Sequence, residues 1–241
     1  MDYDREFLYN AMNDVDYVRH IEPNELSLAD KIGEIIQSYY PSFSEKITTV
    51  DLGIRMGSVS RTILEKFENI NIIAIEENDL LFRCIKPKFT DYIENNKIAF
   101  IHQDFLSALK SIEEGSISFV TSIYSIHNFD NRYRTELYRE IYRILKVGGV
   151  FINGDFFASD DIDDNTKLNQ ERAKHYINAL MQLNKSEYIT EWVTHLIHDI
   201  SQNIEMKESV TVDELKNLNF HEIEFLNRTV GECVLKAIKR Q

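Results

Sequence analysis

The chain has little cysteine and no internal repeats. Its 241 residues include two cysteines, Cys84 and Cys233, together with three prolines and eight glycines. Two cysteines this far apart form neither a CxxC motif nor a disulfide framework. We therefore expect the protein to work in a reducing compartment, and the cytoplasm is the simplest location.

Positive charge is also scarce. Lysine and arginine number 27 against 40 aspartate and glutamate residues, which gives a formal net charge of -13 and a pI near 5.0. Lysines and arginines do not form runs longer than a pair, so nothing would replace the counterions along a phosphate backbone. Binding to nucleic acid or to an anionic membrane surface is therefore disfavoured.

Long apolar runs are missing as well. No stretch approaches the ~20 apolar residues that a membrane-spanning helix needs. The first residues, Met1-Asp-Tyr-Asp-Arg-Glu, are acidic and contain no apolar signal core. The sequence thus predicts a soluble protein without a membrane partner.

What the chain does contain is enough apolar material for a sizeable core, since 43% of its residues are hydrophobic and 11% aromatic. Its length suits one α/β domain with an appended cap. Hydrophobic periodicity divides it into four parts. These are an N-terminal helical arm or lid (1–42), an α/β core (43–157), a helical cap insertion (158–207) and the end of the core (208–241).

Within the core, short β-branched runs alternate with amphipathic helical patterns. Such alternation predicts a mostly parallel sheet with right-handed crossovers and helices on both faces. The last two β-runs, separated by a short loop with Gly231, predict an antiparallel terminal hairpin. The expected strands are Ile47–Asp51, Ile70–Glu76, Ile98–His102, Ile117–Ser122, Val150–Asn153, His221–Asn227 and Cys233–Lys239.

The stretch Ile47–Ser60 organises the rest of the chain. A buried strand ends at Asp51, and a turn with Gly53 and Gly57 leads into a helix. Glycines let a ligand approach the backbone, and a helix start offers unpaired N–H groups. Taken alone, this pattern also fits an ordinary strand-to-helix turn. The carboxylate of Asp51 would repel a pyrophosphate and would suit a ligand that carries a positive charge.

Three further features follow the next strands, where ligands bind in open parallel sheets. Glu76, with Glu77 beside it, could accept both hydroxyls of a ribose, although a solvated loop acid is the simpler interpretation. Asp104 could accept an adenine amino group while Phe105 covers the ring face, although Asp104 also fits a helix N-cap. Backbone and hydroxyl groups near Ser122 would meet the reactive end of a cofactor.

In these four features the chain resembles the class I methyltransferases that depend on S-adenosyl-L-methionine (SAM), of the small-molecule type. The resemblance runs from about Thr48 to Phe156 and includes the helix that ends in Leu-Lys-Val-Gly-Gly. It implies a Rossmann-like, seven-stranded, mostly parallel sheet with an antiparallel terminal hairpin. It also implies SAM as cofactor and S-adenosylhomocysteine (SAH) as product. By the same resemblance, Asp51, Gly53 and Gly57 would hold the methionine moiety, Glu76 the ribose, and Asp104 and Phe105 the adenine.

One residue departs from the family pattern, because Arg55 stands where a further glycine is usual. If the side chain points outward, SAM binding is unaffected. If it points inward, it could pair with Asp51 or with the cofactor carboxylate, or it could weaken binding. We count Arg55 among the cofactor-binding residues.

Methyl transfer needs positioning above all, and a base only where the acceptor must lose a proton. His127, just beyond the fourth strand, is the candidate base, although a structural role for this loop histidine is the simpler one. Tyr124 and Asn128 could orient a substrate, as could Tyr17 from the arm. Glu191, His195 and His198 have metal-ligand spacing on one helix, but surface histidines are common and we expect no metal site.

The sequence favours methyl transfer from SAM to an O, N or C atom of a small-molecule acceptor. A non-catalytic SAM- or SAH-binding partner or sensor stays open, because Arg55 replaces a glycine and no acid/base pair is evident. An NAD-dependent oxidoreductase is disfavoured by Asp51 and by the missing GxGxxG. A homodimer through the cap helices is also left open.

Overall fold

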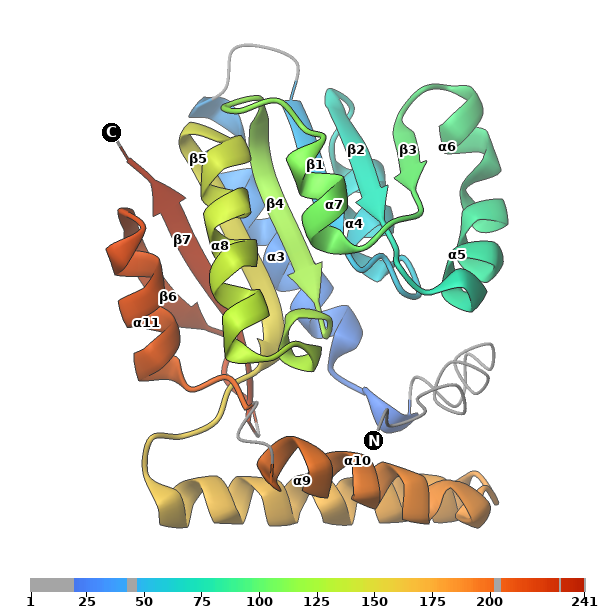
Figure 1. Cartoon of the computed structure of the whole chain (residues 1–241). Coiled ribbons are helices and arrows are strands. Elements are labelled where there is room, and N and C mark those ends of the chain that lie inside the picture. The colour runs from blue at the N-terminus through green and yellow to red at the C-terminus, as the bar shows by residue number, and fades with distance from the viewer. Residues whose placement is uncertain (1–19, 43–46, 202–204, 230, 241) are drawn as a thin grey trace.

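The computed structural model describes residues 20–42, 47–201, 205–229 and 231–240. Its centre is a seven-stranded sheet of order β3-β2-β1-β4-β5-β7-β6 (Figure 1). The pairs among the first five strands are parallel, and β7 runs antiparallel to both β5 and β6. The predicted fold class is thereby confirmed. The strands are β1 (Ile47–Leu52), β2 (Ile70–Ile75), β3 (Ile98–Ile101), β4 (Ile117–Ile123), β5 (Leu145–Phe156), β6 (Phe220–Leu226) and β7 (Glu232–Lys239).

The central strands are apolar because both of their faces are covered. Every residue of β4 is buried, and β1 is buried except at one position. Near-continuous apolar strands of this kind belong to parallel sheets with helices on both sides. The helices are α3 (Glu25–Tyr39), α4 (Ser58–Lys66), α5 (Asp79–Ile85), α6 (Thr90–Glu94), α7 (Phe105–Lys110), α8 (Asn131–Ile144), α9 (Ile162–Gln182), α10 (Ile189–Ser201) and α11 (Glu208–Asn217), with 3-10 turns η1 (Tyr40–Ser42), η2 (Lys86–Phe89), η3 (Ile126–Asn128) and η4 (Ser186–Tyr188).

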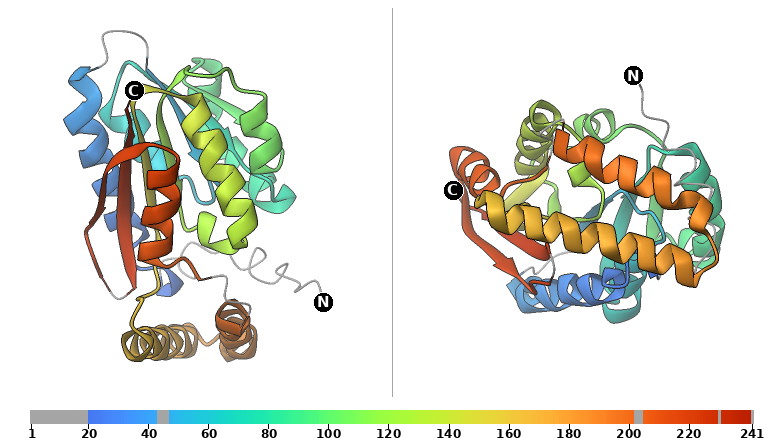
Figure 2. Two further views of the ribbon diagram at one scale, coloured as in Figure 1. Left: turned by 60° about the vertical axis from the view of Figure 1, so that its left-hand side comes forward. Right: turned by 90° about the horizontal axis from the view of Figure 1, so that it is seen from below.

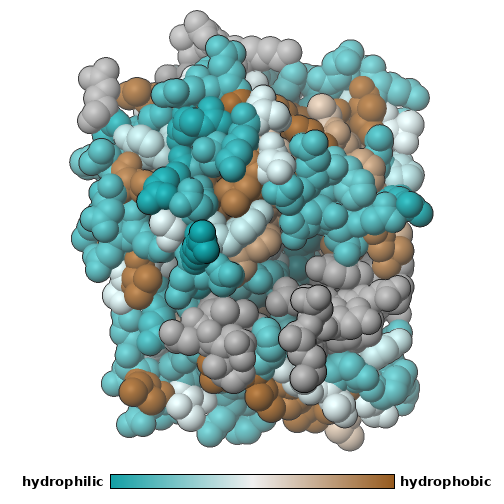
Figure 3. Space-filling view, in the orientation of Figure 1, coloured by the Kyte–Doolittle hydropathy of each residue, from teal (hydrophilic) through white to brown (hydrophobic). Residues whose placement is uncertain are grey.

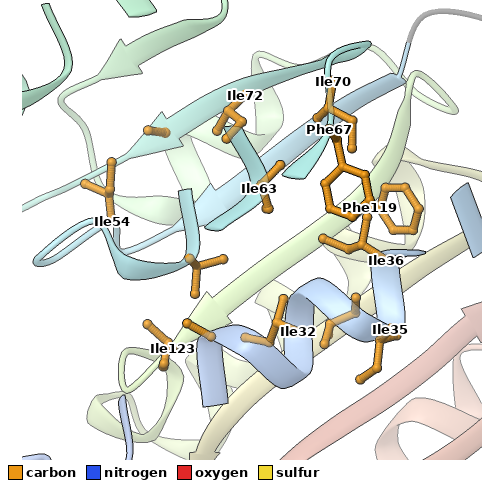
Figure 4. Packing of buried hydrophobic residues seen from close by; sticks show 14 of the residues in the cluster. Ile32, Ile35, Ile36, Ile54, Ile63, Phe67, Ile70, Ile72, Phe119 and Ile123 are labelled. Atoms are coloured by element: carbon orange, nitrogen blue, oxygen red, sulfur yellow. The ribbon is translucent and has the colours of Figure 1, made fainter. Parts of the chain in front are cut away.

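Two apolar clusters fill the space between the sheet and its helices. One joins α3 and α4 to one face of the sheet, and Figure 4 shows Ile32 and Ile36 of α3 in this packing, with Ile36 beside Phe119 of β4. The other joins α7, α8 and α11 to the opposite face through residues such as Leu137 and Leu215. The core is therefore a three-layer α/β/α arrangement.

The strand order places a ligand-binding position between β1 and β4. The chain leaves β1 toward β2 on one side and later returns to β4 on the other side, so the sheet order reverses at this point. Ligands of open α/β sheets bind outside the carboxyl ends of the strands at such a switch point.

A pair of helices covers this edge of the sheet. Helices α9 and α10 lie side by side across the carboxyl ends of the parallel strands (Figures 1 and 2). A third apolar cluster attaches them to the body, where Tyr176, Leu180 and Trp192 pack with Ile21 and Leu81. The predicted helical character of this stretch is confirmed by α9 and α10.

One local prediction was wrong. The fifth strand was predicted to begin at Val150, after the glycine pair of the Leu-Lys-Val-Gly-Gly stretch, but β5 begins at Leu145. The pairing register of β5 with β4 shifts between Ile117 and Phe119, and β5 continues through Gly148 and Gly149 as an irregular strand.

The face presented in Figure 3 carries mainly hydrophilic residues, with hydrophobic residues scattered among them. Within the described ranges, no helix combines the length and the apolar character required to cross a bilayer. The arm prediction for residues 1–19, including the substrate-binding role of Tyr17, lies outside the described residues.

Candidate active site

A cavity of about 270 Å³ lies at the carboxyl ends of the central strands, beneath the cap. Loops from five strands contribute to its wall, and side chains of α9 and α10 form the other side. Of the predicted site residues, it brings together Gly53, Arg55, Glu76, Glu77, Phe105, Tyr124, His127 and Asn128. Lining residues that the sequence did not single out for this site are Glu22, Leu81, Ser125, Phe129, Phe156, Arg172, Tyr176 and Trp192.

Gly53 allows the ends of β1 and β4 to meet. Its φ is +71°, and a Cβ atom there would lie 2.1 Å from Ser125 Oγ. Its N–H donates to the carbonyl of Ile75 on β2 at 2.9 Å. Only glycine combines this backbone conformation with such a close approach. Gly53 therefore sets the shape of the cavity floor.

Gly57 lies at the N-cap of α4 with φ +81°. A Cβ atom there would approach the Phe89 ring to 2.7 Å. It is not among the residues that line the cavity. Its requirement for glycine comes from the backbone and from the packing of α4 against Phe89.

Asp51 connects secondary structure elements below the cavity instead of lining it. Its carboxylate accepts hydrogen bonds from Ser60 Oγ at 2.6 Å and from Thr121 Oγ1 at 2.9 Å. It is 1% exposed, and burial raises its pKa to about 6 although both hydroxyls oppose that change. Ser122 is also buried, and its hydroxyl donates to the carbonyl of Leu52 at 3.0 Å. Both residues therefore hold β1 against its neighbours.

Glu76 ends β2 with its carboxylate at the cavity. It accepts the backbone N–H of Arg55 at 3.2 Å and that of Asn78 at 3.0 Å. Burial raises its pKa, and these two N–H donors counter the increase. A carboxylate fixed in this way can accept further hydrogen bonds from ligand hydroxyls, and Glu77 lines the same wall.

Phe105 and Asp104 have different positions. Phe105 lines the cavity and packs edge-on against Phe129, with ring centroids 5.4 Å apart. Asp104 is exposed and caps α7 by accepting the N–H of Ser107 at 2.9 Å. Hydrogen bonding to the Ser107 side chain, and then to its backbone N–H, lowers the pKa of Asp104. The capping interpretation of Asp104 thus agrees with its observed geometry, and Phe105 supplies the ring contact.

Arg55 points inward and is 7% exposed. Its guanidinium pairs with Glu22, not with Asp51, and Nη1 donates to the carbonyl of Tyr124 at 2.9 Å. Sequence reasoning missed Glu22 because the residue precedes α3 and reaches the site only through the tertiary fold. Arg55 itself has φ 50°, a conformation in which glycine is unstrained.

His127 forms a hydrogen-bonded pair with Asp155. Its Nδ1 lies 2.6 Å from Asp155 Oδ1, and its ring packs edge-on against Phe156. Asp155 is fully buried at the end of β5 and accepts backbone N–H groups of His127 and Phe156. A carboxylate surrounded by donors requires a proton on Nδ1, which leaves the Nε2 lone pair available. The register of β4 beside β5 could have indicated Asp155, because their carboxyl ends meet.

Tyr124 and Asn128 follow β4 at the same wall. The Tyr124 ring is buried and stacks on Phe156 with centroids 5.0 Å apart. Opposite them, Arg172 places its guanidinium 4.1 Å from the Phe156 ring centroid. The cap residue His195 lines the cavity, whereas His198 does not. Among the described residues, no cluster of three or more His, Cys, Asp or Glu side chains is arranged to hold a metal ion.

Comparisons with known proteins agree with this geometry. Residues 49–149 match the family described as methyltransferase domain. The chain is 27% identical over 196 residues to carboxy-S-adenosyl-L-methionine synthase of Nautilia profundicola, a match that covers 81% of this chain and 79% of that protein.

Solved structures share the fold. A protein provisionally described as a SAM-dependent methyltransferase, from Methanococcus maripaludis, superimposes with a TM-score of 0.62 at 17% identity, covering 97% of this chain and 94% of its own. Phosphoethanolamine N-methyltransferase 2 of Haemonchus contortus, in complex with SAM, gives a TM-score of 0.59 at 12% identity. That match covers 88% of this chain and 53% of the enzyme, so the chain spans about half of its length.

The residues present suit SAM. An acid at the tip of β2, a phenylalanine after β3, and a buried arginine whose Nε has no hydrogen-bond partner among the described residues offer contacts for ribose, adenine and a carboxylate. The domain match, the relative and the shared fold lead to one conclusion: the chain contains a methyltransferase domain over residues 49–149, has the fold of class I SAM-dependent methyltransferases, and uses SAM as its cofactor.

Proposed function

We propose that the protein transfers the methyl group of SAM to a small-molecule acceptor, with His127 as general base. The observation that carries this proposal is the His127–Asp155 pair at the cavity wall. When bound, SAM supplies an electrophilic methyl group on its sulfonium. Gly53, Glu76 and Phe105 would hold its adenosine part, with Glu77 beside them. Tyr124 and Asn128 would orient the acceptor.

The pair suits an acceptor whose nucleophilic atom carries a proton. Asp155 holds the imidazole in the tautomer with the proton on Nδ1, so that Nε2 accepts the proton from the acceptor as the new bond forms. The imidazolium that results is stabilised by the buried carboxylate. Side chains of Tyr176 and Trp192 from the cap line the same cavity.

A metabolite-sized acceptor fits the dimensions better than a macromolecule does. The cavity measures about 270 Å³ and is bounded by the cap on the side opposite the strands. This is slightly below the ~300–1,000 Å³ usual for small-molecule sites, and because the same cavity must also hold the cofactor, little room remains beside it for a large acceptor. The formal net charge of -13 likewise argues against nucleic acid as the acceptor.

The test combines a variant series with an acceptor panel of phenols, alcohols, amines and carboxylic acids. We expect His127→Gln to reduce the turnover number about 10²- to 10⁴-fold, the usual contribution of a general base. The dissociation constant for SAH should stay within about twofold of wild type. His221→Gln, an exposed histidine on β6, is the matched control. Turnover that is unchanged in His127→Gln would contradict the assignment.

A second reaction, the carboxylation of SAM, is favoured by one similar protein and by the positive charge at the cavity wall. The Nautilia profundicola protein is named for a carboxylated SAM, and two guanidinium groups, of Arg55 and Arg172, line the cavity here. Mass spectrometry of the nucleoside products separates the alternatives. SAH indicates methyl transfer. A SAM derivative heavier by CO2 indicates the second reaction, in which a carboxylic acid of the panel loses its carboxyl group as CO2 and takes up the proton that the methyl group of SAM gives up as the new C–C bond forms. Unchanged SAM across the panel indicates the non-catalytic binder.

Other expectations stay predictions. They are the cytoplasmic location, the homodimer through the cap, and the division into an arm (1–42), a core (43–157), a cap (158–207) and a terminal part (208–241). Sedimentation of the purified protein at several concentrations would test the homodimer.

A further inference from the structure

The cavity contains a buried ion pair that no family pattern provides. Arg55 is 7% exposed and Glu22 is 8% exposed, and both line the cavity. Removing two charges from water costs several kcal/mol per ion, so a buried ion pair contributes little to the stability of the fold. Its position in the cofactor cavity requires another explanation.

The pair is held from several sides. Nη1 of Arg55 donates to the Tyr124 carbonyl at 2.9 Å, and Nη2 pairs with Glu22. The backbone N–H of Arg55 donates to Glu76, the proposed ribose acceptor. Arg55 therefore lies next to the ribose position and extends from it toward the end of β4.

Both members have capacity left for a ligand. Nε of Arg55 is buried and has no hydrogen-bond partner among the described residues. Burial raises the pKa of Glu22 to about 7, with the positive charge of Arg55 opposing that change. A buried acid in this state gains from a second cation nearby. Arg55 can thus take a carboxylate, and Glu22 can take an ammonium group.

We propose that Arg55 and Glu22 together bind the zwitterionic amino-acid end of SAM, Arg55 through its carboxylate and Glu22 through its ammonium group. Two adjacent buried side chains of opposite charge are complementary to an α-amino acid, which carries the same two charges side by side. In this account, the side chain of Arg55 contacts the amino-acid end of SAM, whereas a glycine in this position could offer only backbone groups.

The competing explanation is that the ion pair blocks the cavity. A cavity of about 270 Å³ exists with the pair in place, which speaks against a plug. The two explanations predict opposite effects of removing the guanidinium, so binding measurements can separate them.

The test is calorimetric titration with three ligands. SAM carries both charged groups, decarboxylated SAM keeps only the ammonium group, and methylthioadenosine lacks the amino-acid end. We expect Arg55→Gly to weaken SAM binding about 10- to 100-fold, which corresponds to about 1.4–2.8 kcal/mol for a charge-assisted contact. Binding of decarboxylated SAM and of methylthioadenosine should not weaken. Glu22→Gln should weaken SAM and decarboxylated SAM about 10-fold or more and leave methylthioadenosine unchanged.

Folding of the variants does not limit this test. Glycine is unstrained at the φ of 50° that Arg55 adopts, and the double variant Arg55→Gly/Glu22→Gln removes both charges at once. Arg61→Gln, an exposed arginine on α4, is the matched control. Because each variant is compared across three ligands, a general loss of stability cancels in the ratio of their affinities.

Two outcomes would overturn the proposal. SAM binding that is unchanged or tighter in Arg55→Gly would identify the pair as a plug. An equal loss for all three ligands would identify a structural role. The titrations need no acceptor and no turnover, so their result is independent of the proposed role of His127.

Discussion

The close approach of β1 to β4 at Gly53 predicts a specific cost for adding one methyl group. In Gly53→Ala, the Cβ atom would lie 2.1 Å from Ser125 Oγ and 2.7 Å from Ser125 Cβ. The φ of +71° costs about 1–2 kcal/mol for any residue with a Cβ. Forcing Ser125 aside adds about 1–3 kcal/mol, as in overpacked cores. We expect the free energy of unfolding to fall by about 2–5 kcal/mol in total.

The chain offers a control that separates the two contributions. Gly115 has φ +64°, and a Cβ atom there would meet nothing within 4 Å. Gly115→Ala should therefore lose only about 1–2 kcal/mol, from the backbone alone. Urea unfolding, with the m-value checked for each variant, measures both losses. If Gly53→Ala lowers the free energy of unfolding by no more than Gly115→Ala does, the proposed close approach of the ends of β1 and β4 is refuted.

Three further predictions concern the site. Asp155→Asn should reduce turnover about 100-fold or more, because the amide no longer fixes the tautomer of His127. The dissociation constant for SAH, measured by calorimetry, should stay within about twofold of wild type. A loss of SAH binding would instead place Asp155 in the cofactor site. Glu76→Gln should weaken the binding of SAM about 10-fold, because it removes the charged acceptor for the ribose hydroxyls. The exposed control Glu68→Gln should leave the affinity for SAM unchanged. Equal affinities of Glu76→Gln and wild type for SAM would exclude the ribose contact. The pKa of Asp51 is raised from 3.8 to about 6, so its charged form is disfavoured in the folded state, and the stability it contributes below pH 4 is lost as pH rises toward 6. At 1.36 kcal/mol per pKa unit, the whole shift corresponds to about 3 kcal/mol, and about 2 kcal/mol of it should be lost by wild type relative to Asp51→Asn between pH 4 and pH 6, measured by urea unfolding. Parallel curves for the two proteins would refute this.

Much of the fold could be read from local patterns. Apolar β-branched runs such as Ile70–Ile75 mark strands because a central parallel strand is buried on both faces. The position of Glu76 and Phe105 at strand ends follows from the same alternation. The extent of β5 could not be read in this way, because its first residues include Gly148 and Gly149, which usually indicate a turn. Pairing with β4, a tertiary interaction, overrides that local preference.

The site was less accessible to sequence reasoning. His127 and Arg55 stood out by position, but the direction of the Arg55 side chain stayed open. Their partners, Asp155 and Glu22, lie 28 and 33 residues away in sequence. Asp51 was expected at the ligand, yet hydroxyls from α4 and β4 surround its carboxylate. Such contacts depend on how the layers pack, and no local pattern encodes them.

The central claim is that the cavity at the ends of β1, β2 and β4 holds the cofactor beside His127. A crystal structure of the protein with SAH tests it most directly. We predict the ribose hydroxyls on Glu76, the adenine against Phe105 and the sulfur facing the wall formed by Tyr124 and His127. SAH bound elsewhere, or no SAH in this cavity at saturating concentration, would contradict the account.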